Sequence, residues 1–148
     1  MTETVGLKRF VRAQAGIYGT ALAELRAGNK RTHWMWFIFP QILGLGLSAN
    51  ARTYAITGRK EAAAYLGHEL LGPRLVECTQ AMLSHAGERS PLAILGPIDA
   101  LKFHSSMTLF DTVAEDEPVF RQALDTFYNG QPDRNTLDML NDLAASQA

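Results

Sequence analysis

The clearest helical pattern of the sequence, ELLGPRLVECTQAMLSHA, runs from Glu69 to Ala86. Its apolar residues recur at intervals of three and four, at Leu71, Leu75, Cys78 and Met82. This is the spacing of one face of an α-helix, so we expect a long helix with Cys78 in the core. Gly72 and Pro73 interrupt the pattern, which indicates either a helix that begins at Pro73 or one that kinks there.

The sequence on both sides of this stretch repeats the helical spacing. We expect a long helix over residues 5–27 with a kink near Gly16, and further helices over the ranges 32–39, 49–56, 59–66, 90–95, 99–113, 117–128 and 133–143. No segment sustains the alternation of apolar and polar residues that a half-buried strand requires. The class is therefore all-α. We expect a compact single domain over residues 1–148 with about eight helices, several of them short, and a core from about residue 5 to 144.

Small polar residues stand where several of these helices should begin. We expect their side chains to accept hydrogen bonds from the free backbone N–H groups of the first helical turn. The expected capping residues are Thr32, Ser48, Thr57, Ser90 and Asp99. Either Asp133 or Asn135 should begin the last helix.

The composition limits the kinds of partner. The chain has 148 residues, of which 47% are apolar, and this is enough for one continuous core without cross-links. Lys and Arg number 14 against 15 Asp and Glu, which gives a formal charge of -1. A balanced charge argues against a broad surface for nucleic acid or acidic lipid, although it leaves room for a local basic pocket.

Cysteine usage and hydropathy bear on the compartment. The single Cys78 cannot form an internal disulfide, so nothing in the sequence indicates an oxidising compartment. The first residues lack the pattern of a signal peptide, and the longest wholly apolar run, Trp34 to Pro40, is too short to cross a bilayer. We therefore expect a cytoplasmic protein without a membrane partner. The sequence does not indicate an oligomeric state.

Several enzyme and cofactor motifs are missing from the sequence. The four histidines are widely separated, with no HExxH pattern and no second cysteine, so no metal site is expected. The GxGxxG, Walker and GxSxG patterns are also missing, which removes three large enzyme classes. We expect no cofactor.

Both tryptophans lie in one aromatic run, His33-Trp34-Met35-Trp36-Phe37-Ile38-Phe39, with a cationic pair before it and an amide after it. Aromatic faces beside cations and free helix N–H groups suit a small anionic ligand with a flat ring, such as a nucleotide. The residues predicted to bind it are Lys30, Arg31, His33, Trp34, Trp36 and Gln41. The alternative is that the aromatic side chains fill the core and the cations are solvated.

A second concentration of polar groups lies between Asp99 and Thr108. On a helix, Asp99, Lys102 and Ser106 would share one face, and we predict that Lys102, Ser105 and Ser106 bind the same ligand. The alternative is a helix cap followed by two small serines that permit close packing. The candidates for acid or base catalysis are Asp99 and His33, because histidine titrates near neutral pH.

Three segments carry a similarity to known sequences: residues 26–41 around the aromatic run, the segment Leu71-Gly72-Pro73-Arg74-Leu75, and Leu101-Lys102 with Ser105-Ser106-Met107-Thr108-Leu109-Phe110. On these segments the chain resembles a family of small bacterial proteins of unknown function, from about Leu7 to Leu140. The resemblance implies a compact, mainly helical domain without an established activity. Members are sometimes labelled calpastatin, a name that does not suit a chain without long disordered repeats.

The chain departs from that family's pattern at two positions. The family usually has a second acidic residue where this chain has Ala100, and often another residue in place of His104. These departures argue against catalysis at the acidic end of the segment, whereas Lys102, Ser105 and Ser106 fit the pattern.

Three hypotheses about function follow. The first is a domain that binds a small anionic or nucleotide-like ligand near the aromatic run. The second is a hydrolase acting on a nucleotide or an ADP-ribose-type substrate, which would need a paired acid and base in an open cleft, so the question of enzymatic activity stays open. The third is a protein-interaction module, which would need Trp36 and Phe39 exposed as one patch.

Overall fold

The computed structural model describes residues 2–147, which form ten helices and no strand. The helices are α1 (Thr2–Gln14), α2 (Tyr18–Ala27), α3 (Met35–Ile38), α4 (Ala49–Thr53), α5 (Arg59–Gly67), α6 (Leu71–Leu83), α7 (Pro91–Leu95), α8 (Pro97–Asp111), α9 (Val119–Tyr128) and α10 (Arg134–Gln147). Helices contain 66% of the residues and build one compact domain, so the all-α class is confirmed. The expected number of about eight helices is wrong.

One additional helix arises at Gly16. The helix expected over residues 5–27 is divided into α1 and α2, because Gly16 adopts a φ of +77°. Glycine reaches this left-handed region easily, since it has no Cβ to oppose it. The turn lets α2 pack on α6 while α1 packs on α3 and α5.

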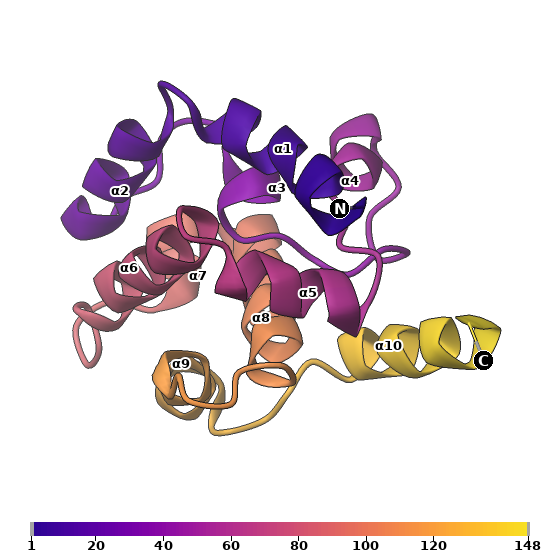
Figure 1. Cartoon of the computed structure of the whole chain (residues 1–148). Helices are drawn as coiled ribbons and strands as arrows, with labels where there is room; N and C mark the ends of the chain where they lie inside the picture. The colour runs from indigo at the N-terminus through magenta and orange to yellow at the C-terminus, as the bar shows by residue number, and fades with distance from the viewer. Residues whose placement is uncertain (1, 148) are drawn as a thin grey trace.

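Helix α8 lies at the centre of the fold (Figure 1). It contacts α5, α7, α9 and α10. Its buried apolar residues are Phe103, Met107, Leu109 and Phe110. The ring of Phe103 also packs edge-on against Phe39 of the aromatic run, with 4.9 Å between ring centroids. These contacts hold α8 beside the aromatic run.

The glycine and proline within residues 69–86 have separate explanations. Helix α6 begins at Leu71, so Pro73 lies in its first turn, where an N–H group would have no partner within the helix. Gly72 is required because a Cβ there would lie 2.1 Å from the carbonyl oxygen of Leu66. Cys78 is buried in the same helix as expected, and burial raises the pKa of its thiol to about 12.

Two of the five expected capping side chains are confirmed. The hydroxyl of Ser48 accepts a hydrogen bond of 3.1 Å from the N–H of Ala51, and the hydroxyl of Ser90 accepts one of 3.1 Å from Ala93. These bonds satisfy N–H groups that have no partner within α4 and α7.

Three expected caps are wrong: Thr32, Thr57 and Asp99. The helix expected at Thr32 begins later, at Met35, whereas α5 begins at Arg59 as expected and follows Gly58; neither helix has a side-chain cap. Helix α8 begins earlier than expected, at Pro97, because the fixed φ of proline suits the first helical turn. Asp99 thus lies inside the first turn, and its side chain is directed to other partners.

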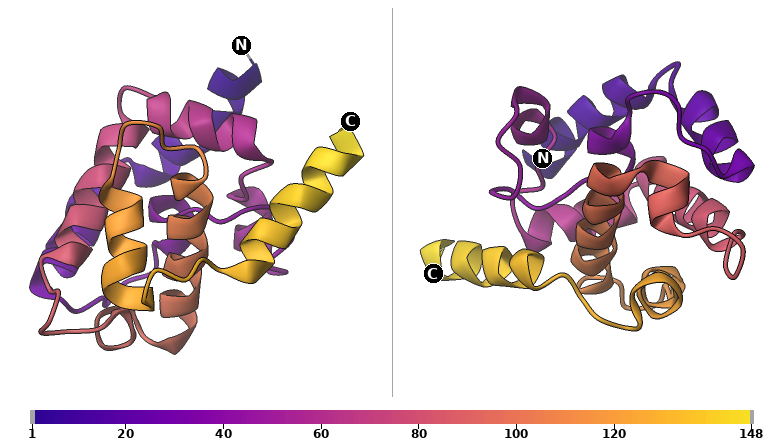
Figure 2. Two further views of the ribbon diagram at one scale, coloured as in Figure 1. Left: turned by 90° about the horizontal axis from the view of Figure 1, so that it is seen from below. Right: turned by 180° about the vertical axis from the view of Figure 1, so that it is seen from behind.

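Helix α10 extends away from the body of the molecule (Figures 1 and 2). It packs on α8, and its Leu140 is buried. Near its start, Met139 lies so close to the α3–α4 connection that a Cβ on Gly44 would be 2.2 Å from its Cε. None of the described helices is long and apolar enough to span a membrane.

Candidate ligand site

The first tryptophan of the aromatic run belongs to the core. Trp34 is fully buried, and its indole N–H donates a hydrogen bond of 3.0 Å to Oε1 of Glu24 on α2. The same carboxylate accepts bonds of 2.7–3.0 Å from the backbone N–H groups of Arg31 and Thr32 and from the hydroxyl of Thr32. Glu24 therefore fixes the loop that leads into the aromatic run.

These four hydrogen bonds change the acidity of Glu24. Partial burial by itself would raise the pKa of its carboxyl group, but the four bonds donated to the carboxylate outweigh this effect. The pKa falls from its ordinary value of 4.5 to about 2. The carboxylate is thus fully ionised at neutral pH, and its four partners belong to the protein itself.

Lys30 joins this loop to α8. Its backbone N–H donates a 2.8 Å bond to the carbonyl of Ile94, and its side chain is only 7% exposed. The ammonium lies 2.9 Å from Oδ2 of Asp99 and donates a 2.6 Å bond to the carbonyl of Thr32. It also lies 4.9 Å from the centroid of a Trp34 ring. A cation buried to this degree requires such compensation for its lost hydration.

Lys102 shares the carboxylate of Asp99 but is held less closely. Its Nζ lies 3.7 Å from Oδ1, which is too long for a hydrogen bond, and its side chain is 23% exposed. The ammonium lies 5.1 Å from the centroid of a ring of the half-buried Trp36. The described residues give this ammonium no hydrogen bond. Two ammonium groups thus face one carboxylate, and the donors of Lys102 are available to a ligand.

Lys102 lies on the wall of a surface depression of about 300 Å³. The lining comes from the α3–α4 connection, from the first half of α8 and from the turn into α10. Its polar side chains are Gln41, Lys102, Ser105, Asp133 and Asn135. Segments far apart in the sequence therefore place five polar groups around one concave surface.

Gln41 is held in this lining by its backbone. Its carbonyl accepts a 2.9 Å bond from the N–H of Ile56, next to an isolated parallel bridge between Ile42 and Ile56. The side-chain amide of Gln41 makes no hydrogen bond within the described part of the chain, so it can offer both donors and an acceptor to a ligand.

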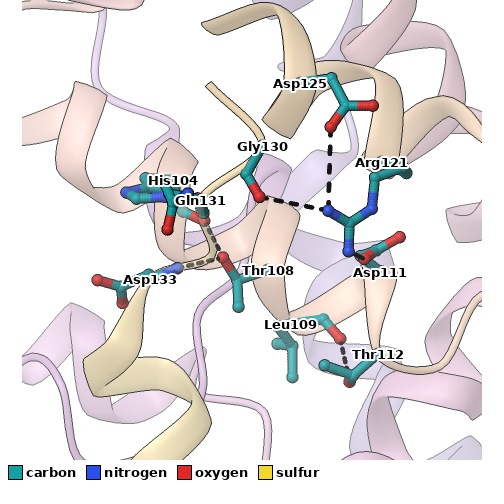
Figure 3. Close-up of polar contacts among 10 residues, drawn as sticks. All are labelled: His104, Thr108, Leu109, Asp111, Thr112, Arg121, Asp125, Gly130, Gln131 and Asp133. Atoms are coloured by element: carbon teal, nitrogen blue, oxygen red, sulfur yellow. Dashed lines mark hydrogen bonds and ion pairs between the residues drawn. The ribbon is translucent and has the colours of Figure 1, made fainter. Parts of the chain in front are cut away.

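Asp133 is held by both α8 and α10. Its backbone N–H donates a 2.8 Å bond to Oγ1 of Thr108 (Figure 3). Its Oδ2 accepts bonds from the hydroxyl of Ser105 at 3.0 Å, and from the N–H and hydroxyl of Thr136 at 3.2 and 2.6 Å. Asp133, and not Asn135, therefore caps the last helix, and it ties the start of that helix to α8.

Exposed aliphatic side chains line the same depression. Ile98 is 69% exposed and Leu101 is 70% exposed, and both belong to α8. The partly buried Leu45 also lines the depression, from the α3–α4 connection. Such exposed apolar groups beside a concave polar surface are typical of a binding site, because they can cover the carbon skeleton of a ligand.

Comparison with known proteins bears on the family. Residues 4–140 match a family model described as a protein of unknown function (DUF1810). The chain belongs to this family. The conserved hypothetical protein Rv1873 from Mycobacterium tuberculosis has a similar crystal structure, with a TM-score of 0.87 and 50% sequence identity. That similarity covers 91% of this chain and 96% of the mycobacterial one. Among curated proteins, none matches the sequence.

In this DUF1810 protein, five of the residues predicted to bind a ligand come together. They are Lys30, Trp36, Gln41, Lys102 and Ser105. Three of the five line the depression. Lys30 pairs with Asp99, which Lys102 also faces, and the ring of Trp36 lies beside the ammonium of Lys102. Asp99, proposed as a catalytic residue, lies between the two lysines.

Four other predicted residues lie elsewhere. The side chains of Arg31 and His33 are exposed and make no hydrogen bond or ion pair within the described residues. Trp34 lies in the core, and Ser106 is fully buried. The Oγ of Ser106 has no hydrogen-bond partner in the part of the chain that the structure describes.

The sequence did not predict three residues with defined places around the site: Glu24, Asp133 and Asn135. Glu24 carries no local signal, since its partners follow it by seven to ten residues. Asp133 was expected only to begin a helix, and its place beside α8 depends on the path of the turn after α9. Ile98 and Leu101 could have been identified from the sequence, because they are apolar residues of α8 that lie outside its core-facing side.

The described residues contain no group of three or more His, Cys, Asp or Glu side chains that could hold a metal ion. The chemistry available at the depression is therefore that of one ammonium, one carboxylate, two amides, a hydroxyl and an aliphatic surface.

Proposed function

We propose that this protein binds a small anionic, nucleotide-like ligand in the depression beside Lys102. One observation carries the proposal: the ammonium of Lys102, on a side chain that is 23% exposed, makes no hydrogen bond with the described residues, and the carboxylate that it faces, on Asp99, is already paired with Lys30. A phosphate or carboxylate group of a ligand would supply the missing acceptors. Hydrogen bonds between ionised groups are about twice as strong as those between neutral groups.

The size and surface of the depression support a ligand of modest size. Its volume of about 300 Å³ is at the lower end of the range for small-molecule sites, roughly 300–1,000 Å³. A mononucleotide or a sugar phosphate suits this volume better than a dinucleotide. The aliphatic side chains of Leu45, Ile98 and Leu101 would cover the carbon skeleton or the ring of such a ligand.

The two other hypotheses have weaker support. A hydrolase that uses His33 would need a partner for its imidazole, but that side chain is exposed and makes no polar contact with the described residues. An interaction module built on the aromatic run would need a continuous exposed patch, whereas Phe39 is buried. Ligand binding is the function that the depression supports best.

The proposal can be tested by a thermal-shift screen of mononucleotides, sugar phosphates and inorganic phosphate. A ligand at 100 times its Kd adds about 2.7 kcal/mol to the apparent stability, which is easily measured. We expect at least one phosphorylated compound to stabilise the wild-type protein and to lose most of its affinity for Lys102→Gln.

Lys8→Gln is the matched control, because Lys8 is exposed on α1, far from the lining residues in sequence and outside the depression. The control variant should keep full affinity. The proposal fails if no phosphorylated or carboxylated compound stabilises the protein, or if Lys102→Gln binds the stabilising compound as tightly as the wild type does.

A further inference from the structure

The two oxygens of the Asp133 carboxylate are used differently. Oδ2 accepts three hydrogen bonds, from Ser105 and from the N–H and hydroxyl of Thr136. Oδ1 accepts none from the described residues, although Asp133 lines the depression. One oxygen of the carboxylate is therefore committed to the fold, and the other is a free anionic acceptor beside a concave surface.

The position of this free acceptor is fixed by α8. The backbone N–H of Asp133 bonds to Thr108, and two residues earlier the carbonyl of Gln131 lies 2.7 Å from Nε2 of His104. Figure 3 shows both contacts along the same side of α8. The imidazole of His104 also stacks on Tyr128, with 3.9 Å between the ring centroids and 5° between the ring planes. The end of α9 is thus held at Tyr128 and the turn into α10 at Gln131 and Asp133, so Oδ1 needs little reorganisation before it binds a ligand.

The groups next to Asp133 suit hydroxyl groups better than a second anion. A carboxylate repels phosphate but accepts hydrogen bonds from hydroxyls, and ribose hydroxyls are commonly bound by acidic side chains in this way. The amides of Gln41 and Asn135 line the same depression, and both can donate and accept. The cation and the free carboxylate come from different walls, so they divide the depression into a part for an anion and a part for hydroxyls.

We infer that the ligand is a phosphorylated sugar with neighbouring hydroxyl groups, free or as part of a mononucleotide, and that Oδ1 of Asp133 selects it by accepting a hydrogen bond from one of those hydroxyls. The inference rests on the proposed function, since it takes Lys102 as the residue that binds the phosphate. The Asp133 carboxylate is a specificity-determining group, and compounds that carry the anion without the hydroxyls bind more weakly.

The test compares ribose 5-phosphate with 2-deoxyribose 5-phosphate by titration calorimetry on the full-length protein. A hydrogen bond to a charged acceptor corresponds to about tenfold to a hundredfold in affinity, so the wild type should bind ribose 5-phosphate tighter by about that factor. Asp133→Asn keeps an oxygen that can cap α10 but lacks the charge. In this variant the ratio between the two sugars should fall to near one.

Asp138→Asn is the matched control, because Asp138 is exposed on the same helix and does not line the depression. This variant should keep the wild-type ratio. Thermal unfolding of both variants monitors the cap, and Thr136→Val gives a second measurement: Thr136 does not line the depression, and the variant removes one of the bonds to Oδ2 but leaves Oδ1 free, so it should keep the preference for ribose.

The possible results separate the two proposals. If both sugars bind wild type equally, or if Asp133→Asn keeps the preference, the inference is overturned and the proposed function stands. If inorganic phosphate or a small carboxylate binds as tightly as either sugar phosphate, the inference is likewise overturned and the proposed function stands. If no phosphorylated or carboxylated compound binds, both proposals are overturned together.

Discussion

Two polar clusters lie beside the two tryptophans of the aromatic run, and they differ in how completely their hydrogen bonds are satisfied. Around Trp34, both oxygens of Glu24 and the ammonium of Lys30 are engaged by other groups of the protein. Around Trp36, the ammonium of Lys102 and the amide of Gln41 make no hydrogen bond with the described residues. The first cluster has no capacity left for a ligand, whereas the second has donors and acceptors in a concave surface.

Satisfied and unsatisfied hydrogen bonds therefore distinguish the scaffold from the candidate site, although both are built from the same residue types. A lysine, a carboxylate and a tryptophan occur in each cluster. Substitution of a residue whose polar groups are all hydrogen-bonded should cause a large loss of stability. Substitution of a residue with unsatisfied donors or acceptors should cause a small loss of stability and a large loss of ligand binding.

The largest expected difference lies between the two tryptophans themselves. Trp34→Ala should lower the free energy of unfolding by about 3–5 kcal/mol, because it opens a cavity in the core and removes a donor to Glu24. Trp36→Ala should lower it by about 1 kcal/mol, since this side chain is only partly buried. Urea denaturation measures both values, and equal losses would refute the distinction between the two clusters.

The two lysines should differ next. Lys30→Met should lower the free energy of unfolding by about 2–3 kcal/mol, because it leaves Asp99 and the carbonyl of Thr32 without their close cationic partner. Lys102→Met should change it by less than about 1 kcal/mol, as its contact with Asp99 is long and partly exposed. Chemical denaturation of the two variants in parallel is the measurement. A larger loss for Lys102→Met would mean that Lys102 is the structural member of the pair.

Glu24 should give the first cluster a dependence on pH. Its pKa of about 2 in the folded protein lies below the ordinary value of 4.5, so the ionised carboxylate stabilises the fold above pH 4.5. This stabilisation should be lost as the pH falls from about 4.5 toward 2, when the carboxylate becomes protonated. Glu24→Gln should therefore be less stable than the wild type by about 1–2 kcal/mol at neutral pH, and this difference should shrink at low pH.

The check is a series of denaturation curves between neutral pH and about pH 2.5, with Glu88→Gln as the control. Glu88 is an exposed glutamate whose side chain has no hydrogen bond or ion pair within the described residues. The control should follow the wild type at every pH. A constant difference between Glu24→Gln and the wild type across the series would show that the charge of Glu24 does not matter.

The smallest expected effects are at Arg31 and His33. Both side chains are exposed, and Arg31 contributes to the Glu24 cluster only through its backbone N–H. Alanine at either position should change the free energy of unfolding by less than about 0.5 kcal/mol and leave ligand affinity unchanged. Thermal shift with the stabilising ligand measures both properties. A loss of affinity at either residue would extend the site beyond the depression.

Much of the fold was predictable because it depends on local physics. The spacing of Leu71, Leu75, Cys78 and Met82 predicts a helix whether or not the neighbouring elements are known, and Ser48 and Ser90 cap helices through bonds to residues three positions away. The division at Gly16 was harder to predict, because glycine permits both a kink and a full turn, and the packing of α2 on α6 decides between them.

The candidate site was predictable only in part. Four of its residues could be recognised as polar groups in two segments of the sequence. Lys30 and Gln41 flank the aromatic run, and Lys102 and Ser105 lie in the second polar segment. The opposite wall of the depression could not be predicted, because the path of the α9–α10 turn brings Asp133 and Asn135 there. That path depends on tertiary contacts such as the stack of His104 on Tyr128, which no local pattern in the sequence indicates.

The position of Lys102 over Trp36 also has a practical consequence for spectroscopy. The chain contains only two tryptophans, and Trp34 is sealed in the core, so its fluorescence emission should vary little with solvent or ligand. Trp36 has a positive charge 5.1 Å from a ring centroid, and an anion that draws this charge away changes the electric field at the indole. In a Trp34→Phe background, the emission wavelength of Trp36 becomes an intrinsic optical sensor of occupancy that requires no attached dye.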